Sequence, residues 1–173
     1  AWCIPYGAAM VGAKLVLPGP KMGDAEVLHH LMESEGVTLS AGVPTVWLAL
    51  LNYLSDNNKT LDSLDRILVG GSACPLMIMD EFADKYSVKV YTGWGMTETG
   101  RILADCHEPR RTNTRAFGKP LPGMEARVVD DDDNNVGFDN DGELLVRHSA
   151  ETPRKWFFSG YHKNEAETEK AWR

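Results

Sequence analysis

The sequence contains little cysteine and is short of positive charge, and each shortage excludes a class of protein. Among 173 residues there are three cysteines, Cys3, Cys74 and Cys106, at wide spacings and without a Cys-x-x-Cys pair. A disulfide framework and a zinc site are therefore not expected, and a reducing, cytoplasmic environment is favoured. Lysine and arginine number 18 against 25 aspartate and glutamate residues, so the net charge is −7. Because phosphate backbones require clustered positive charge, nucleic acid is not expected as a partner.

Long apolar runs are also absent. No apolar stretch approaches the roughly 20 residues that cross a bilayer, so no transmembrane segment is expected. Hydrophobic residues still make up 43% of the chain, which is enough to form a core. The chain begins Ala1-Trp2-Cys3 rather than at a methionine, and it shows no signal peptide. We therefore expect an internal segment of a longer protein.

Strand-like and helix-like segments alternate in the first half of the chain. The strand-like runs are residues 13–17, 37–43, 66–69 and 88–91. The helix-like segments run from the N-cap Asp24 to about Glu35, onward from Pro44, and from Pro75 to Tyr86. This alternation predicts an α/β fold with a mainly parallel sheet flanked by helices.

The second half has a different pattern. Two strand candidates, residues 125–129 and 143–147, are joined by a polar loop with no helix between them. This arrangement predicts an antiparallel hairpin belonging to part of a small β-barrel. We expect an α/β subdomain over residues 1–110 and a β-barrel-like subdomain over residues 111–173.

Two turns rich in small residues follow neighbouring strand candidates, and they are the best candidates for a ligand site. Residues 70–74 follow one strand, and residues 93–98 follow the next. Ligands bind at the carboxyl ends of strands in open α/β sheets. Ser72 and Ala73 would form one wall of a slot for a purine ring, and Trp94 the other. Thr97 offers a phosphate contact, and Glu98 offers a hard oxygen ligand for Mg²⁺.

Four motifs in this order resemble those of one enzyme family. Gly93 to Thr99 resembles the adenylate-forming signature of the acyl-CoA synthetases, usually Gly-Tyr-Gly-x-Thr-Glu. Leu68 to Pro75 resembles the adenine-binding turn of that family. Phe117 to Gly123 and Gly142 to Arg147 resemble its later blocks. Trp94, in place of the commoner tyrosine, is more similar to the branch that uses medium- and long-chain fatty acids.

The resemblance implies a reaction and a set of site residues. Family members use ATP and Mg²⁺ to form acyl-AMP from a carboxylic acid, and then transfer the acyl group to coenzyme A. It implies catalytic roles for Thr97 and Glu98, with Glu98 as the metal ligand. The residues implied in binding the adenylate are Gly71, Ser72, Ala73, Cys74, Gly93, Trp94, Gly95, Met96 and Thr97. The residues implied in binding the acyl group are Val43, Trp47, Gly70 and Gly71, although core packing is the simpler reading of Trp47.

The resemblance also implies parts that this chain does not contain. They are the upstream phosphate-binding loop, the downstream ribose-binding aspartate and the C-terminal domain with its catalytic lysine. We therefore expect the 173-residue chain alone to be inactive. The expected partner is a fatty acid substrate, and a homodimer is left open.

Three alternatives compete with this interpretation. Ser72 lies in a Gly-x-Ser-x-Cys sequence, whereas the elbow of a serine hydrolase needs a glycine where Cys74 stands. Asp139 to Gly142 suggests a calcium loop, but either alignment puts residues that cannot act as ligands at required positions. The third alternative is a non-catalytic nucleotide-binding or interaction module that keeps the fold. Retention of both Thr97 and Glu98 argues against this last one.

Overall fold

The computed structural model describes residues 4–106 and 118–172, and it divides into two compact units. The first, called the α/β unit here, comprises Ala1–Trp94 and Leu103–Lys119. The second, called the C-terminal unit, comprises Gly95–Ile102 and Pro120–Arg173. The predicted boundary between residues 110 and 111 lies outside the described residues and stays a prediction.

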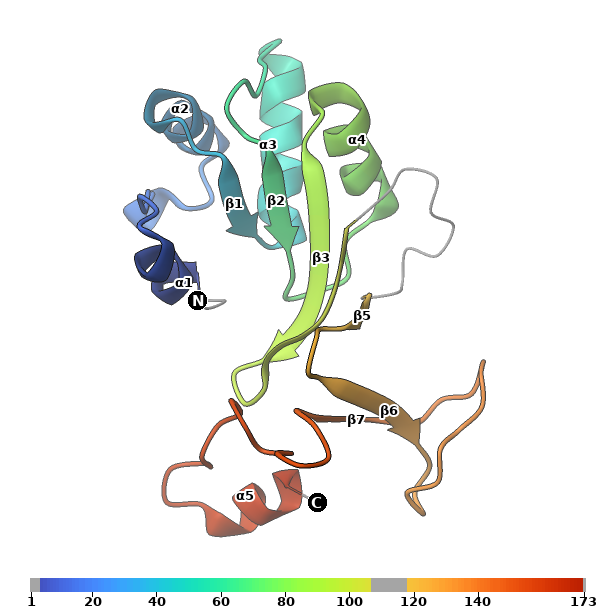
Figure 1. Cartoon of the computed structure of the whole chain (residues 1–173). Helices are drawn as coiled ribbons and strands as arrows, with labels where there is room; N and C mark the ends of the chain where they lie inside the picture. The colour runs from blue at the N-terminus through green and yellow to red at the C-terminus, as the bar shows by residue number, and fades with distance from the viewer. Residues whose placement is uncertain (1–3, 107–117, 173) are drawn as a thin grey trace. The chain divides into compact units, whose positions relative to one another are not determined.

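The predicted α/β fold is confirmed. The elements are α1 Ile4–Val11, η1 Gly19–Lys21, α2 Ala25–Glu35, β1 Leu39–Gly42, α3 Pro44–Asp56, β2 Arg66–Val69, α4 Leu76–Tyr86, β3 Lys89–Met96, β4 Gly100–Cys106 and β5 Lys119–Pro120. The five strands form one sheet in the order β1-β2-β3-β4-β5. Strands β1, β2 and β3 pair in parallel, with Gly42 opposite Val69 and Val69 opposite Thr92. The carboxyl ends of these three strands therefore lie at the same edge of the sheet (Figure 1).

Helices α2 and α3 begin where the sequence predicts. The Asp24 side chain accepts a hydrogen bond of 3.1 Å from the backbone N–H of Val27, which caps α2. Gly36 ends α2 in the left-handed region, with φ of 62°. Pro44 occupies the first turn of α3, where its missing N–H costs no helical hydrogen bond.

The core of the α/β unit lies between these helices and the sheet. The side chains of Trp47 and Phe82 are buried and meet edge to face, with ring centroids 5.9 Å apart. The buried aliphatic residues around them include Leu50, Leu51, Leu54, Ile67, Ile78, Val88 and Val90. Helix α3 packs beside α2 and α4, so its apolar face is covered from both sides (Figure 1). Helix α4 contributes Ile78, Met79 and Phe82 to this core and leaves Leu76 exposed.

Several predicted strands differ from the observed ones. Residues 13–17 form no strand, and Leu17 is 76% exposed. No strand within residues 4–106 and 118–172 pairs with this apolar run, which follows helix α1, a helix that was not predicted. Strand β1 is shorter than the predicted run of residues 37–43 and only partly buried. Strand β3 continues past Tyr91 to Met96, so the first part of the glycine-rich signature, Gly93 to Met96, lies in a strand rather than after it.

The C-terminal unit contains the predicted antiparallel hairpin. Strands β6 Glu125–Val129 and β7 Glu143–Arg147 pair in antiparallel register, and Glu125 lies opposite Arg147. The side chains of those two residues form an ion pair with an N–O distance of 2.6 Å. Helix α5 Glu165–Ala171, which was not predicted, begins at Asn164, whose side chain accepts from the N–H of Glu167.

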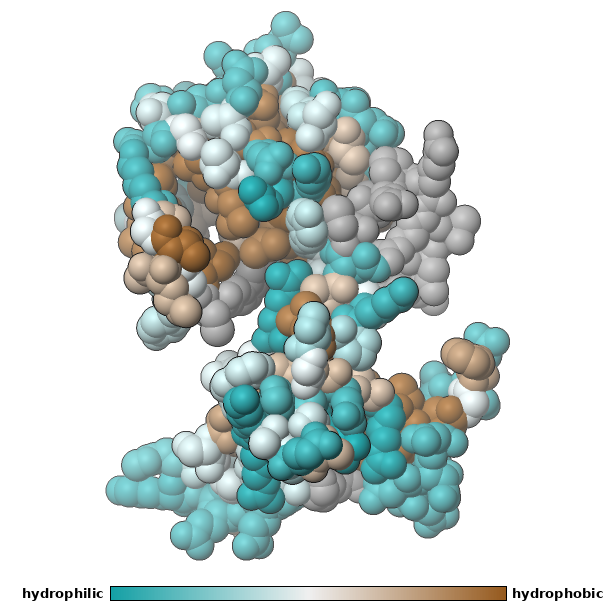
Figure 2. Space-filling view, viewed as in Figure 1, coloured by the Kyte–Doolittle hydropathy of each residue, from teal (hydrophilic) through white to brown (hydrophobic). Residues whose placement is uncertain are grey.

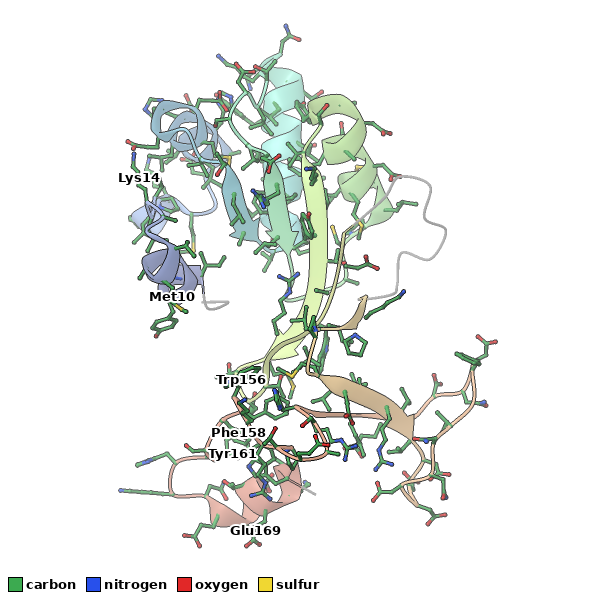
Figure 3. The ribbon with its side chains drawn as sticks, viewed as in Figure 1. Met10, Lys14, Trp156, Phe158, Tyr161 and Glu169 are labelled. Carbon is green, nitrogen blue, oxygen red and sulfur yellow. The ribbon has the colours of Figure 1, made fainter. Side chains whose placement is uncertain are left out.

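Helix α1 buries none of its residues. Tyr6, Met10 and Val11 are 75–87% exposed, and Figure 2 shows hydrophobic atoms on the surface where α1 lies. Figure 3 shows the Met10 side chain at the outer end of this helix. No helix among residues 4–106 and 118–172 combines the length and apolar character needed to cross a membrane.

Candidate functional site

Two predicted substrate-binding residues, Gly70 and Gly71, lie in the turn that follows β2, and a third, Val43, lies beside that turn. Gly71 adopts a φ of +81°, a conformation that side-chain-bearing residues rarely adopt. A Cβ atom added at Gly71 would lie 3.2 Å from Cγ1 of Val43, which stands between β1 and α3. Val43 is 39% exposed, so part of its surface is open to a ligand. Val43, Gly70 and Gly71 thus lie together at the carboxyl edge of the sheet.

The rest of this turn contains exposed and buried residues in succession. Ser72 and Ala73 are exposed, whereas Cys74 is 7% exposed and its Sγ donates to the carbonyl oxygen of Pro75 at 3.7 Å. Burial raises the pKa of the Cys74 thiol to about 11. A thiol with that pKa stays protonated near neutral pH, so Cys74 anchors the turn and is not a nucleophile. No hydrogen bond joins Ser72 to His148 or His162, and His107, the remaining candidate base of the hydrolase alternative, lies outside the described residues.

Trp47 is a core residue in this structure. Its side chain is 1% exposed, and its indole N–H donates a hydrogen bond of 3.0 Å to the carbonyl oxygen of Gly42. A Cβ atom added at Gly42 would lie 3.1 Å from the indole ring, so the ring packs directly against the end of β1. This contact agrees with the simpler reading of Trp47. Its implied role in the acyl pocket stays a prediction.

Strand β3 presents the first part of the signature. Thr92 is buried, and Gly93 and Trp94 follow it as half-buried residues of the α/β unit. The partial exposure of Trp94 leaves some of its indole surface available for stacking. The strand then continues into the C-terminal unit through Gly95 and Met96.

A tight turn between β3 and β4 carries Thr97 and Glu98. The hydroxyl of Thr99 accepts a hydrogen bond of 3.2 Å from the N–H of Met96 and donates one of 3.1 Å to the carbonyl oxygen of Gly100. A Cβ atom at Gly95 would lie 2.0 Å from that same carbonyl oxygen, so only glycine fits there. Thr99 is therefore a structural residue of the site that the sequence reasoning did not single out. Its signal was a hydroxyl directly before a glycine in a turn.

Glu98 is held at both its backbone and its side chain. Its carbonyl oxygen accepts a hydrogen bond of 2.8 Å from the N–H of Phe158. Its carboxylate oxygen Oε1 accepts one of 2.9 Å from the hydroxyl of Tyr161. This bond to a carboxylate raises the pKa of Tyr161 above its usual value. Tyr161 and Phe158 were not predicted as site residues, and Figure 3 shows them together in the C-terminal unit.

The donor set near Glu98 fits a magnesium ion that is held mainly by its substrate. No group of three or more His, Cys, Asp or Glu side chains within the described residues could hold a metal alone. Mg²⁺ in nucleotide sites is bound through one or two carboxylates together with substrate phosphates and water. One carboxylate beside an exposed Thr97 matches that pattern. The loop that contains Asp139 to Gly142 is exposed.

Comparison with known proteins decides the family. The family model described as AMP-binding enzyme matches residues 1–162. The chain belongs to this family. It is 39% identical, over 99% of its length, to a long-chain-fatty-acid–CoA ligase of Thermus thermophilus, of which it covers 32%. It is 41% identical, over 85% of its length, to a medium-chain-fatty-acid–CoA ligase of Ectopseudomonas oleovorans, of which it covers 29%.

The fold of the AMP-binding family is found again among solved structures. The crystal structure of the anthranilate CoA ligase AuaEII with anthranoyl-AMP matches 92% of this chain with a TM-score of 0.77 and 22% identity. The match covers 30% of that ligase. The chain thus spans about a third of the length of the proteins it matches.

Proposed function

We propose that this chain is part of an ATP-dependent fatty acid–CoA ligase that forms acyl-AMP and then acyl-CoA. Its membership of the AMP-binding family supports this proposal, as does identity of about 40% to two ligases named for fatty acids. In the first step, a carboxylate oxygen attacks the α-phosphorus of ATP and pyrophosphate leaves. In the second, the thiol sulfur of coenzyme A attacks the acyl carbon and AMP leaves.

The arrangement of Glu98 is the single observation that carries the proposal. The turn from Met96 to Gly100 is fixed by Thr99, and Glu98 is fixed further by Phe158 and Tyr161. A carboxylate held in this way can bind Mg²⁺ without first paying the cost of ordering its own side chain. Thr97 next to it is exposed and supplies a hydroxyl for a phosphate oxygen. Glu98 would hold the Mg²⁺ ion, whose positive charge would offset that of the triphosphate, and Thr97 would help to position the phosphate groups as the substrate carboxylate attacks.

The turn after β2 would bind the other parts of the acyl-adenylate. Gly71, Ser72 and Ala73 offer backbone groups and little side-chain bulk, which suits an adenine ring. Gly93 to Met96, including the half-buried Trp94, would contribute the stacking surface. Val43 and Gly70 would border the acyl group, with Trp47 supporting that wall from the core. Coenzyme A would be the acyl acceptor, and a cytoplasmic location and a homodimer belong to the same proposal.

Replacing Glu98 with glutamine tests the assignment in the full-length enzyme. The substitution removes one charge and keeps the shape, so we expect fatty-acid-dependent ATP–pyrophosphate exchange to fall at least 100-fold, a range typical for loss of a preorganised electrostatic group. Glu169→Gln serves as the matched control, because Glu169 is an exposed residue of α5 in the same unit (Figure 3). Exchange at the wild-type rate in Glu98→Gln would refute the assignment.

The same experiment separates the ligase from a non-catalytic nucleotide-binding module. Such a module would bind ATP without any exchange that depends on a carboxylic acid. The wild-type protein and the Glu169→Gln control would then both lack exchange, while ATP binding by calorimetry would persist.

A further inference from the structure

We propose that Tyr161 is a positioning residue that orients the Glu98 carboxylate for Mg²⁺. This inference rests on the proposed function, because it assumes that Glu98 meets the metal–nucleotide complex. Tyr161 lies 63 positions after Glu98 in the sequence and outside the adenylate-forming signature.

The contact engages one oxygen of the carboxylate and leaves the other available. The Tyr161 hydroxyl donates to Oε1 of Glu98 at 2.9 Å. Within the described residues, Oε2 receives no hydrogen bond, and no lysine or arginine is paired with Glu98. A neutral hydroxyl fixes the rotamer of the carboxylate but leaves its negative charge in place. A lysine or arginine in the same position would neutralise the charge that a divalent cation needs.

Tyr161 is in turn held by its own surroundings. Its backbone N–H donates a hydrogen bond of 2.9 Å to the hydroxyl of Thr168 on α5. That hydroxyl donates to the carbonyl oxygen of Asn164 at 2.8 Å. The first turns of α5 therefore hold the backbone at Tyr161 in place. Gly160 has a φ of +141°, and an added Cβ would lie 2.8 Å from Cγ2 of Thr168. The backbone at Tyr161 therefore packs closely against α5.

The aromatic ring of Tyr161 is fixed as well. It meets the ring of Phe158 edge to face, with centroids 4.9 Å apart. The ring of Phe158 stacks on Trp172 with centroids 5.4 Å apart, and Trp172 follows α5 directly. Phe158 also donates its N–H to the carbonyl oxygen of Glu98. One short segment thus fixes Glu98 through its backbone with Phe158 and through its side chain with Tyr161 (Figure 3).

These contacts explain how the Glu98 side chain can keep one rotamer although Glu98 lies in a turn. A glutamate side chain has three rotatable bonds, and ordering them costs side-chain entropy. The bond from Tyr161 meets that cost before the nucleotide arrives. The role of Tyr161 is therefore expected in the binding of Mg²⁺-ATP and not in the binding of ATP alone.

Tyr161→Phe in the full-length enzyme tests the inference. The change removes one hydroxyl and keeps the ring that packs on Phe158. ATP is titrated calorimetrically with and without Mg²⁺, and the ratio of the two affinities is compared with that of the wild type. This ratio should fall about 3- to 10-fold, the range for one lost hydrogen bond. Affinity for metal-free ATP and the melting temperature should stay at their wild-type values. Tyr53→Phe on α3 is the matched control, and it should leave both affinities unchanged.

Two further variants keep the result interpretable. Thr168→Val retains Tyr161 but removes the hydroxyl that holds its backbone, so it should reduce the Mg²⁺-dependent gain by a smaller factor. In a Glu98→Gln background, Tyr161→Phe should have no additional effect on the affinity for Mg²⁺-ATP, because the group it orients is gone.

The outcomes separate this inference from the proposed function. If Glu98→Gln itself leaves the Mg²⁺-dependent gain unchanged, then the proposed role of Glu98 is wrong. If Glu98→Gln removes the gain and Tyr161→Phe behaves as the wild type, then only the positioning role is overturned. A Tyr161→Phe variant that binds ATP more weakly to the same degree with and without Mg²⁺ also overturns it, because that pattern indicates a general structural role.

Discussion

At the scale of single residues, candidate ligand-contacting side chains were easier to predict from the sequence than the side chains that support the turn. Thr97, Glu98 and Trp94 stand out because their residue types suit phosphate, metal and ring contacts. Thr99, Phe158 and Tyr161 act on the turn through hydrogen bonds, two of them from a distant segment. Such contacts between distant segments depend on the tertiary fold, so local sequence patterns do not reveal them.

Trp94 gives the first prediction at this scale. If its half-buried indole stacks on adenine, Trp94→Ala should weaken ATP binding by about 1–3 kcal/mol, the range for stacking of a base on an aromatic side chain. Trp94→Tyr should be nearly neutral, because a tyrosine ring offers a similar face. Calorimetry with Mg²⁺-ATP measures both variants. An alanine variant with unchanged affinity and a lower melting temperature would assign Trp94 to packing instead.

Cys74 gives a prediction about pH. The Cys74 thiol has a pKa of about 11 in the folded chain. In the unfolded chain the pKa of a cysteine thiol is about 8.5. Between those two pH values the unfolded state binds fewer protons, so this group lowers the free energy of unfolding as pH rises. The thiolate is the nucleophile, so iodoacetamide should label Cys74 at pH 8 on the order of 100-fold more slowly in the folded than in the denatured protein. Peptide mass spectrometry measures this ratio, and equal labelling rates would contradict the buried position.

At the scale of elements, the local signals predicted α2, α3, β2, β6 and β7 closely. Helix caps at Asp24 and Gly36 and the proline at residue 44 are chemical signals that do not depend on distant parts of the chain. The extension of β3 beyond Tyr91 and the strand β4 were not predicted, because the glycines there are typical of loops in isolation. In the folded chain those glycines allow two strand backbones to come close together, which is a tertiary effect.

Gly95 tests that explanation. Gly95→Ala would place a Cβ atom 2.0 Å from the carbonyl oxygen of Gly100, so the β3–β4 turn must shift. We expect a loss of stability of about 1–3 kcal/mol, as for other overpacked sites, together with loss of fatty-acid-dependent exchange. Gly7→Ala on α1 is the matched control, because nothing lies within 4 Å of an added Cβ there. Thermal unfolding of both variants provides the comparison, and equal melting temperatures would show that the turn accepts a side chain.

At the scale of the whole molecule, family membership supports a proposed reaction that the described residues alone do not define. The match over residues 1–162 shows the family, while the chain spans about a third of the relatives' length. Acyl-AMP formation needs the triphosphate to be held in line with the attacking carboxylate, and positioning supplies much of the rate in such reactions. We therefore expect that activity from the full-length enzyme, and no acyl-AMP from the 173-residue chain alone.

Direct detection of the acyl-adenylate tests the central claim most sharply. The full-length enzyme is incubated with Mg²⁺-ATP and either decanoate or palmitate, without coenzyme A, and the products are separated by chromatography and mass spectrometry. The account predicts acyl-AMP and pyrophosphate in equal amounts, formed only when the fatty acid is present, and then conversion to acyl-CoA and AMP once coenzyme A is added. ADP and inorganic phosphate in place of acyl-AMP, or the same products without any fatty acid, would contradict it.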